Sequence, residues 1–174
     1  ACQARSPEGN PVVLPMIPTM FPVPSYASEA YLDEATRFYH LLGEALAPYV
    51  YPKGPIVLLQ VDNEGAMFFR DGPYDQDHHP DALAKYHAFL RERFGSIDAL
   101  RTAYPHLSEA EGPMRFSDVA PPRAFDVETT AELAHHLDWA AFQEDLVAQS
   151  LARLNGALQS AGLGGIPTTH NFSL

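Results

Sequence analysis

The chain has 174 residues, of which 46% are hydrophobic, so it can bury a core of its own. Its 22 acidic residues outnumber 11 basic ones and give a formal net charge of −11. This excess argues against a nucleic-acid partner, because affinity for phosphates comes mainly from Lys and Arg. No apolar run approaches the roughly 18 residues of a membrane span, and the single cysteine, Cys2, excludes an internal disulfide.

The first 27 residues contain six prolines, which forbid a helix and leave room for an edge strand at most. We therefore expect a long, shaped loop over residues 1–27. Because the sequence begins at Ala1 without a methionine, we also expect the chain to be an internal segment of a longer protein.

The next element is predicted to be an amphipathic helix that begins after Ser28 and stops before Pro48. Its apolar positions recur at steps of three and four: Tyr31, Ala35, Phe38, Leu42 and Ala45. After a turn, residues 56–61 form a run that is apolar except for Gln60 and rich in β-branched side chains. Such a run is typical of a parallel strand that is covered on both faces.

The second half of the chain is predicted to be mainly helical. Pro80 stands at a first helical position and Gly95 ends that helix, while Ser96 starts a short helix to about residue 103. Residues 104–126 hold four prolines and predict a second long loop. A helical pattern then covers residues 127–161, with Val147, Leu151, Leu154 and Leu158 as its clearest stripe, and a new strand is expected near residues 166–171.

Strands separated by helices imply right-handed β/α units with a parallel sheet, in which ligands bind at the carboxyl ends of the strands. Both predicted strands end in polar residues: Asp62, Asn63 and Glu64 after the first, His170 and Asn171 in the second. A carboxylate at such a position is held by a rigid element, and partial desolvation raises its pKa toward that of a general acid. Alternatively, Asp62 and Glu64 are merely a solvated strand end.

A wider resemblance favours the catalytic reading. Residues 54–65, GPIVLLQVDNEG, resemble the acid/base strand of the β-galactosidases of glycoside hydrolase families 35 and 42. Residues 31–39 resemble the helix before that strand, and residues 89–100 resemble the family 42 segment in which a helix ending R-[YF]-G precedes a short helix. Residues 137–142 and 167–172 are similar to the following helix and strand, so the resemblance spans roughly residues 22–174.

The resemblance implies part of a (β/α)8 TIM barrel, from about strands 3/4 to strand 5, with one partial domain over residues 1–174. In it, residues 1–27 form a loop-rich opening segment and residues 28–174 the β/α units. Glu64 would be the acid/base of retaining hydrolysis of β-galactosides or related β-glycosides, and Asn63 would bind the sugar 2-hydroxyl. A retaining mechanism needs a second carboxylate as nucleophile. In this clan it follows strand 7, and would therefore lie outside this chain.

We further expect His170 and Asn171 to contact the carbohydrate substrate, with no cofactor, no metal, no nucleic acid and no membrane involved. A homo-oligomer of the complete protein is compatible with the sequence. One departure from the family is Gly65, where a tyrosine is usual after the glutamate. Because a closed barrel takes roughly 250 residues, the chain alone should be catalytically inactive.

Two alternatives remain open at this point. The first is a non-catalytic carbohydrate-binding or scaffold protein that kept the strand corner and lost the nucleophile. The second is a metal-dependent hydrolase that uses two histidine clusters, one formed by Asp75, Asp77, His78 and His79 and the other by His135 and His136. Neither cluster has the i, i+4 spacing of a helical zinc site, and solvated loop histidines are the commoner case.

Overall fold

The computed structural model describes residues 2–16, 19–63, 73–107 and 114–171. Within these ranges the elements are β1 (Val13–Met16), β2 (Thr19–Pro22), α1 (Glu29–Leu46), β3 (Leu59–Asn63), α2 (Pro80–Phe94), α3 (Ile97–Ala103), α4 (Thr130–Leu158) and β4 (Thr168–Asn171). None of the described helices is both long enough and apolar enough to cross a membrane.

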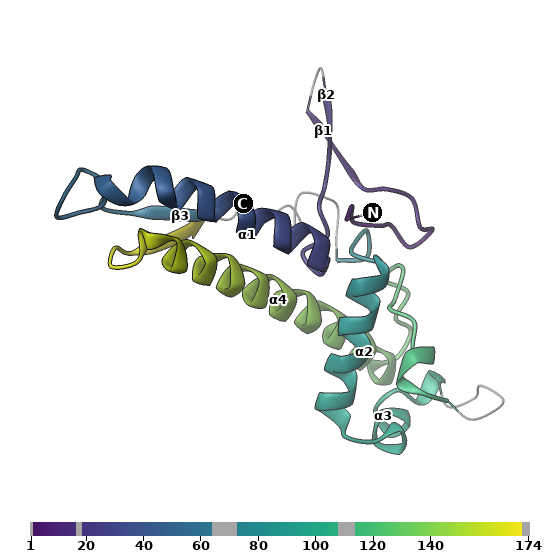
Figure 1. Cartoon of the computed structure of the whole chain (residues 1–174). Helices are drawn as coiled ribbons and strands as arrows, with labels where there is room; N and C mark the ends of the chain where they lie inside the picture. The colour runs from purple at the N-terminus through teal and green to yellow at the C-terminus, as the bar shows by residue number, and fades with distance from the viewer. Residues whose placement is uncertain (1, 17–18, 64–72, 108–113, 172–174) are drawn as a thin grey trace.

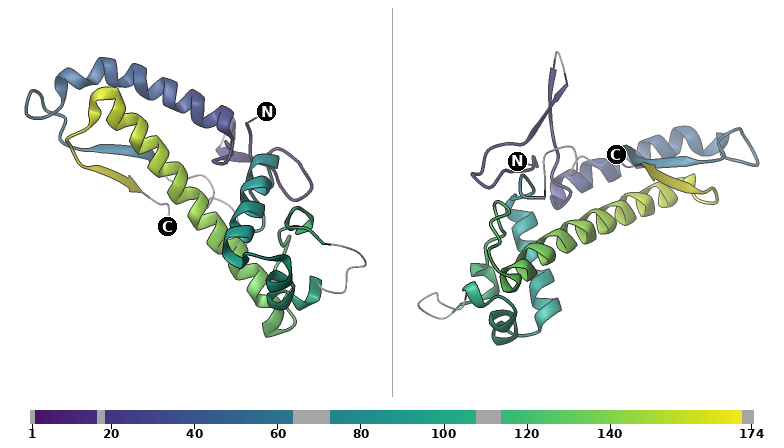
Figure 2. Two further views of the ribbon diagram at one scale, coloured as in Figure 1. Left: turned by 60° about the horizontal axis from the view of Figure 1, so that its bottom comes forward. Right: turned by 180° about the vertical axis from the view of Figure 1, so that it is seen from behind.

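Strands β3 and β4 pair in parallel, as the alternation of helices and strands predicted. Helices α1 and α4 run along this pair, and all four elements form an elongated layer at one end of the molecule (Figures 1 and 2). Helix α4 has 29 residues, so it is roughly 44 Å long and continues past the strands to α2 and α3. One helix therefore connects the strand layer to a second, helical region.

Each of the two regions has its own core. In the helical region, α2, α3 and α4 bury a cluster of aromatic and aliphatic side chains that includes Tyr86, Tyr104, Trp139 and Phe142. In the strand layer the core is smaller and aliphatic, with Leu32 of α1, Val61 of β3 and Leu154 of α4 among its buried members. The packing of the chain is therefore concentrated in the helical region.

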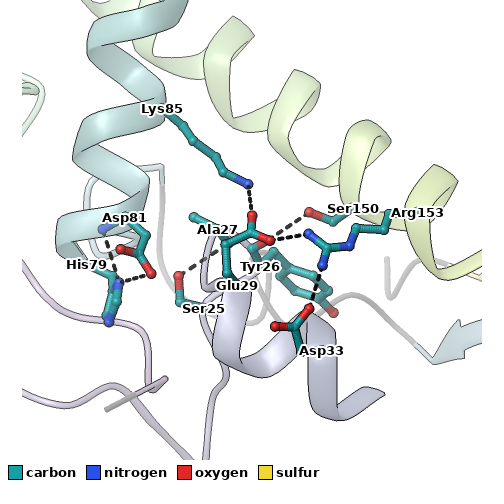
Figure 3. A network of polar contacts seen from close by, with 10 residues as sticks. All are labelled: Ser25, Tyr26, Ala27, Glu29, Asp33, His79, Asp81, Lys85, Ser150 and Arg153. Carbon is teal, nitrogen blue, oxygen red and sulfur yellow. Dashed lines mark hydrogen bonds and ion pairs between the residues drawn. The ribbon is translucent and has the colours of Figure 1, made fainter. Parts of the chain in front are cut away.

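The start of α1 is tied to both neighbouring helices (Figure 3). Glu29 accepts hydrogen bonds from Arg153 of α4 and from Lys85 of α2, and Arg153 also reaches Asp33 at 2.8 Å. Side chains in these ion pairs are more than a third exposed, so each pair contributes little to stability. Their effect is to set the position of α1 relative to the other two helices.

The helix predictions are confirmed in most details. Helix α1 follows Ser28 and ends at Leu46, and α2 starts at Pro80 and ends before Gly95, whose φ of +69° favours glycine. Helix α4 starts at Thr130, three residues later than predicted, and helical structure continues beyond its end as a π-helical turn over Gln159–Leu163. The face expected for α1 was wrong at two positions: Phe38 is 58% exposed and Ala45 is exposed too, while Leu32 and Gly43 are buried.

The expectation of a loop over residues 1–27 was wrong for eight residues. Strands β1 and β2 form an antiparallel hairpin that projects from the body of the molecule (Figures 1 and 2). Pro22 is paired with Val13 and Pro15 with Met20. The hydrogen bonds of the ladder lie in the pairs next to these, as from the backbone N–H of Val23 to the carbonyl of Val12. A two-stranded ribbon thus tolerates these prolines where their missing N–H groups face outward.

The predicted strand over residues 56–61 is also corrected. Strand β3 runs over Leu59–Asn63, so it starts three residues later and includes the polar end. Val57 and Leu58 precede it and are 60% and 52% exposed, which contradicts the expectation of a run covered on both faces. Apolar composition alone did not reveal where pairing with β4 begins.

Candidate active site

The carboxyl end of β3 contains a β-bulge beside β4. Leu59 pairs with Thr168 and Gln60 with Thr169, but the next pair is Asn63 with Asn171. Between the last two pairs β3 advances by three residues while β4 advances by two, so β3 carries one extra residue. An extra residue changes the side to which the following side chains point, and bulges of this kind are frequent next to active sites.

The bulge brings three side-chain amides together. Nε2 of Gln60 donates to Oδ1 of Asn63 at 2.9 Å and to Oδ1 of Asn171 at 2.8 Å. Nδ2 of Asn171 also donates to Oδ1 of Asn63, at 3.3 Å. We call Gln60, Asn63 and Asn171 the amide triad; it is exposed, so a ligand can reach it.

Asp62 is held by contacts from two elements. Its Oδ2 accepts a hydrogen bond of 2.6 Å from the hydroxyl of Tyr26, which precedes α1, and its Oδ1 accepts one of 2.8 Å from the backbone N–H of Asn63. Tyr26 is itself buried, and its carbonyl accepts a bond of 2.9 Å from Ser150 of α4 (Figure 3). The backbone at Asn63 is therefore connected through Asp62 and Tyr26 to the long helix.

Two further tyrosines of α1 lie close to Asp62. Burial raises the pKa of Tyr31 to about 12, and the negative charge of Asp62 adds to this shift. The same two causes raise the pKa of Tyr39, whose hydroxyl donates to the carbonyl of Val61. Both phenols therefore stay protonated at neutral pH, and Tyr39 keeps its hydrogen bond to β3.

The structure describes three of the four predicted site residues. Glu64 lies outside the described residues, and its neighbour Asn63 is the last described residue of β3. Asn63 and Asn171 are brought together by the parallel pairing of β3 and β4. His170 is partly buried and, by the alternation of side chains along a strand, points to the face of β4 opposite Asn171. Substrate binding by these residues stays a prediction.

The first histidine cluster has structural roles. Oδ1 of Asp77 accepts from the backbone N–H groups of Arg5 and His79, at 3.1 and 2.8 Å. Nδ1 of His79 accepts from the N–H of Asp81 and so caps the start of α2. His78 contacts the carbonyl of Tyr74 at 3.1 Å. These contacts fasten the N-terminal segment and the start of α2 to one another.

The second cluster lines a hollow of about 470 Å³ between α4 and the segment before it. Nδ1 of His135 is 3.4 Å from Nε2 of His106, and His136 lies 3.5 Å from Asp126 and 2.9 Å from the hydroxyl of Tyr74. Burial, with the two neighbouring histidines, lowers the pKa of His135 to about 4. In residues 2–16, 19–63, 73–107 and 114–171, no three His, Cys, Asp or Glu are grouped to hold a metal ion.

Gln60 and Tyr26 were not predicted as site residues. Gln60 belongs to the sequence run that carries the family resemblance, so the signal was present, but a bulge cannot be read from the sequence and the expected alternation separates residues 60 and 63. Tyr26 contacts Asp62 across 36 positions of the chain, and the sequence carries no sign of that pairing.

The chain resembles solved β-galactosidase structures over almost its whole length. It superimposes on the enzyme from Bacillus circulans sp. alkalophilus with a TM-score of 0.73 at 19% identity, covering 98% of this chain and 23% of that one. The corresponding values for the enzyme from the psychrophilic Marinomonas ef1 are 0.71, 20%, 98% and 24%. A third match, the catalytic domain of β-amylase from Paenibacillus polymyxa, has a TM-score of 0.62 at 14% identity, over 96% of this chain and 41% of that domain.

These likenesses, at 20% identity or below, show the fold: the chain is a mixed α/β segment that matches part of the barrel catalytic domains of these enzymes. It spans about a quarter of the length of the β-galactosidases. No curated protein sequence matches it significantly. The model of glycoside hydrolase family 42, described as β-galactosidase, matches residues 22–174, and the chain therefore belongs to this family.

Proposed function

We propose that this chain forms the acid/base corner of a retaining glycosidase barrel that acts on terminal β-galactosides or related β-glycosides. In this proposal β3 and β4 are barrel strands 4 and 5, and residues 1–174 form one partial domain. The observation that carries the proposal is the parallel pairing that sets Asn63 beside Asn171 at the carboxyl ends of two strands, in a chain of this family.

Glu64 follows Asn63 directly in the sequence and takes the role of the acid/base. As an acid it protonates the glycosidic oxygen when the leaving group departs, and as a base it then removes a proton from the attacking water. Asn63 hydrogen-bonds the sugar 2-hydroxyl beside the reacting carbon. The second carboxylate, which forms the glycosyl intermediate, is supplied by a part of the barrel outside this chain.

The proposal is tested by kinetics of the complete protein that contains this chain. The Glu64→Gln variant should lose about 10²- to 10⁴-fold in turnover of an aryl β-galactoside whose leaving group needs a proton, the range typical of a lost general acid. The loss in the glycosylation step should be much smaller when the leaving group is acidic enough to depart unprotonated. Unchanged rates on the poorly activated substrate would contradict the assignment.

The matched control is Glu144→Gln, which makes the same chemical change at an exposed position of α4. It should leave both rates unchanged. If the complete protein binds a galactoside but turns over neither substrate, with or without Glu64, the chain belongs to a carbohydrate-binding protein that has lost catalysis.

A further inference from the structure

Gln60 stands at the centre of the amide triad. Its amide nitrogen carries two hydrogens, and the two short contacts direct one to Asn63 and the other to Asn171. In a regular strand, residues 60 and 63 would point to opposite faces, so this contact depends on the extra residue of the bulge. The bulge thus places the glutamine beside both strand-end asparagines.

The triad determines which end of the Asn63 amide faces outward. Oδ1 of Asn63 accepts from both Gln60 and Asn171, which uses its two lone pairs. Within the part of the chain that the structure describes, Nδ2 of Asn63 donates to no protein group. The group that Asn63 presents to a ligand is therefore an N–H donor, and its carbonyl oxygen is turned inward.

We propose that Gln60 is a positioning residue that fixes the side-chain amide of Asn63 in this orientation, so that Nδ2 donates a hydrogen bond to a sugar hydroxyl. This inference rests on the proposed function and adds to it the direction of that hydrogen bond. An arrangement in which all three side-chain amides are turned by 180° would also satisfy these contacts, because the side-chain oxygen of Gln60 could accept N–H groups from both asparagines. Of the two, the structure has the orientation in which Gln60 donates to both asparagines.

The test replaces the donor by an acceptor of the same shape in the complete protein. In Gln60→Glu, the carboxylate accepts from Nδ2 of both asparagines and so turns Oδ1 of Asn63 outward. We expect kcat/KM for an aryl β-galactoside to fall by about 10- to 100-fold, which corresponds to an unsatisfied or reversed polar contact. For the matching 2-deoxygalactoside, which lacks the hydroxyl, kcat/KM should change less than about twofold.

Two controls separate this effect from a change in fold or charge. Gln159→Glu makes the same substitution at an exposed site after α4 and should leave both substrates unaffected. In a protein that already carries Asn63→Ala, the Gln60→Glu substitution should cause little further loss, because the group through which it acts is gone. Thermal melting shows whether each variant is folded.

The outcomes distinguish this inference from the proposed function. If Asn63→Ala and Glu64→Gln reduce activity while Gln60→Glu does not, the positioning role is wrong and the glycosidase corner stands. Equal losses of Gln60→Glu on the galactoside and the 2-deoxygalactoside would also overturn the positioning role. If neither Asn63→Ala nor Glu64→Gln has an effect, the proposed function itself fails.

Discussion

The helical region and the strand layer stabilise their residues by different means. In the helical region, Trp139 and Tyr86 are fully buried and meet at 5.0 Å between ring centroids. In the strand layer, Val61 is the only buried residue of β3 within its described span, and the strand end is held by polar contacts from Tyr26, Tyr39 and the amide triad. Stability is thus concentrated in one region, while the chemistry that we propose depends on directional contacts in the other.

The largest effect on stability should come from Trp139→Ala. Trp139 is fully buried, contacts Tyr86 and Phe142, and donates from Nε1 to the carbonyl of Pro73 at 2.6 Å. Its truncation should lower the free energy of unfolding by about 3–5 kcal/mol in urea titrations. The control Leu137→Ala, on the exposed face of the same helix, should cost less than about 0.5 kcal/mol. Similar losses for both would contradict the assignment of the core.

A second effect is expected on the free energy of unfolding at acidic pH. His135 has a pKa of about 4 in the folded chain, against an ordinary value of 6.5. Between these values the unfolded chain binds a proton that the folded chain does not, so stability should fall as the pH drops from 6.5 to 4, by up to about 3 kcal/mol. Burial lowers the pKa of His78 as well and acts in the same direction.

The histidine contribution is measured by urea titrations across this pH range. His135→Gln should weaken the pH dependence, whereas His40→Gln, which changes an exposed histidine of α1, should leave it as it is. If the slope of stability against pH is the same in all three proteins, the buried imidazole of the helical region is not its source.

A smaller effect is expected in the strand layer from Gly43→Ala. The backbone of α1 approaches Ala161, in the turn after α4, so closely that a Cβ at residue 43 would overlap with its backbone and side chain. The substitution should cost about 1–3 kcal/mol, as overpacking does, although alanine favours helices. Gly156→Ala, which meets no atom within 4 Å on α4, is the control and should be neutral or stabilising. A stabilised Gly43→Ala protein would show that α1 and the turn can move apart.

The smallest change in stability should accompany Tyr26→Phe. This variant removes one hydrogen bond to Asp62 and keeps the buried ring, so we expect a loss of about 1–2 kcal/mol. In the complete protein it should nevertheless reduce kcat for a galactoside more than the larger destabilisation by Gly43→Ala does. If the loss of kcat in the two variants is instead proportional to their loss of stability, the contact of Tyr26 with Asp62 has no effect on catalysis beyond its effect on stability.

The sequence predicted the helices better than the site. Ser28, Pro80 and Gly95 act through local backbone chemistry, and the structure places helix ends at all three. Local signals failed for β1 and β2, where prolines hide a hairpin, and for β3, whose bounds depend on pairing with β4. Asn171 was predicted from its strand end and Asn63 from the family resemblance, whereas Gln60 and Tyr26 depend on a bulge and on a contact between distant residues.

The most direct test of the proposed corner is the product that azide forms with the Glu64→Gln variant of the complete protein. If Glu64 is the acid/base of a retaining enzyme, azide needs no general base, attacks the glycosyl intermediate and restores turnover of an activated aryl β-galactoside. The product should then be β-galactosyl azide, identified by NMR. Formation of the α-azide would make Glu64 the nucleophile, and absence of any rescue would contradict the account.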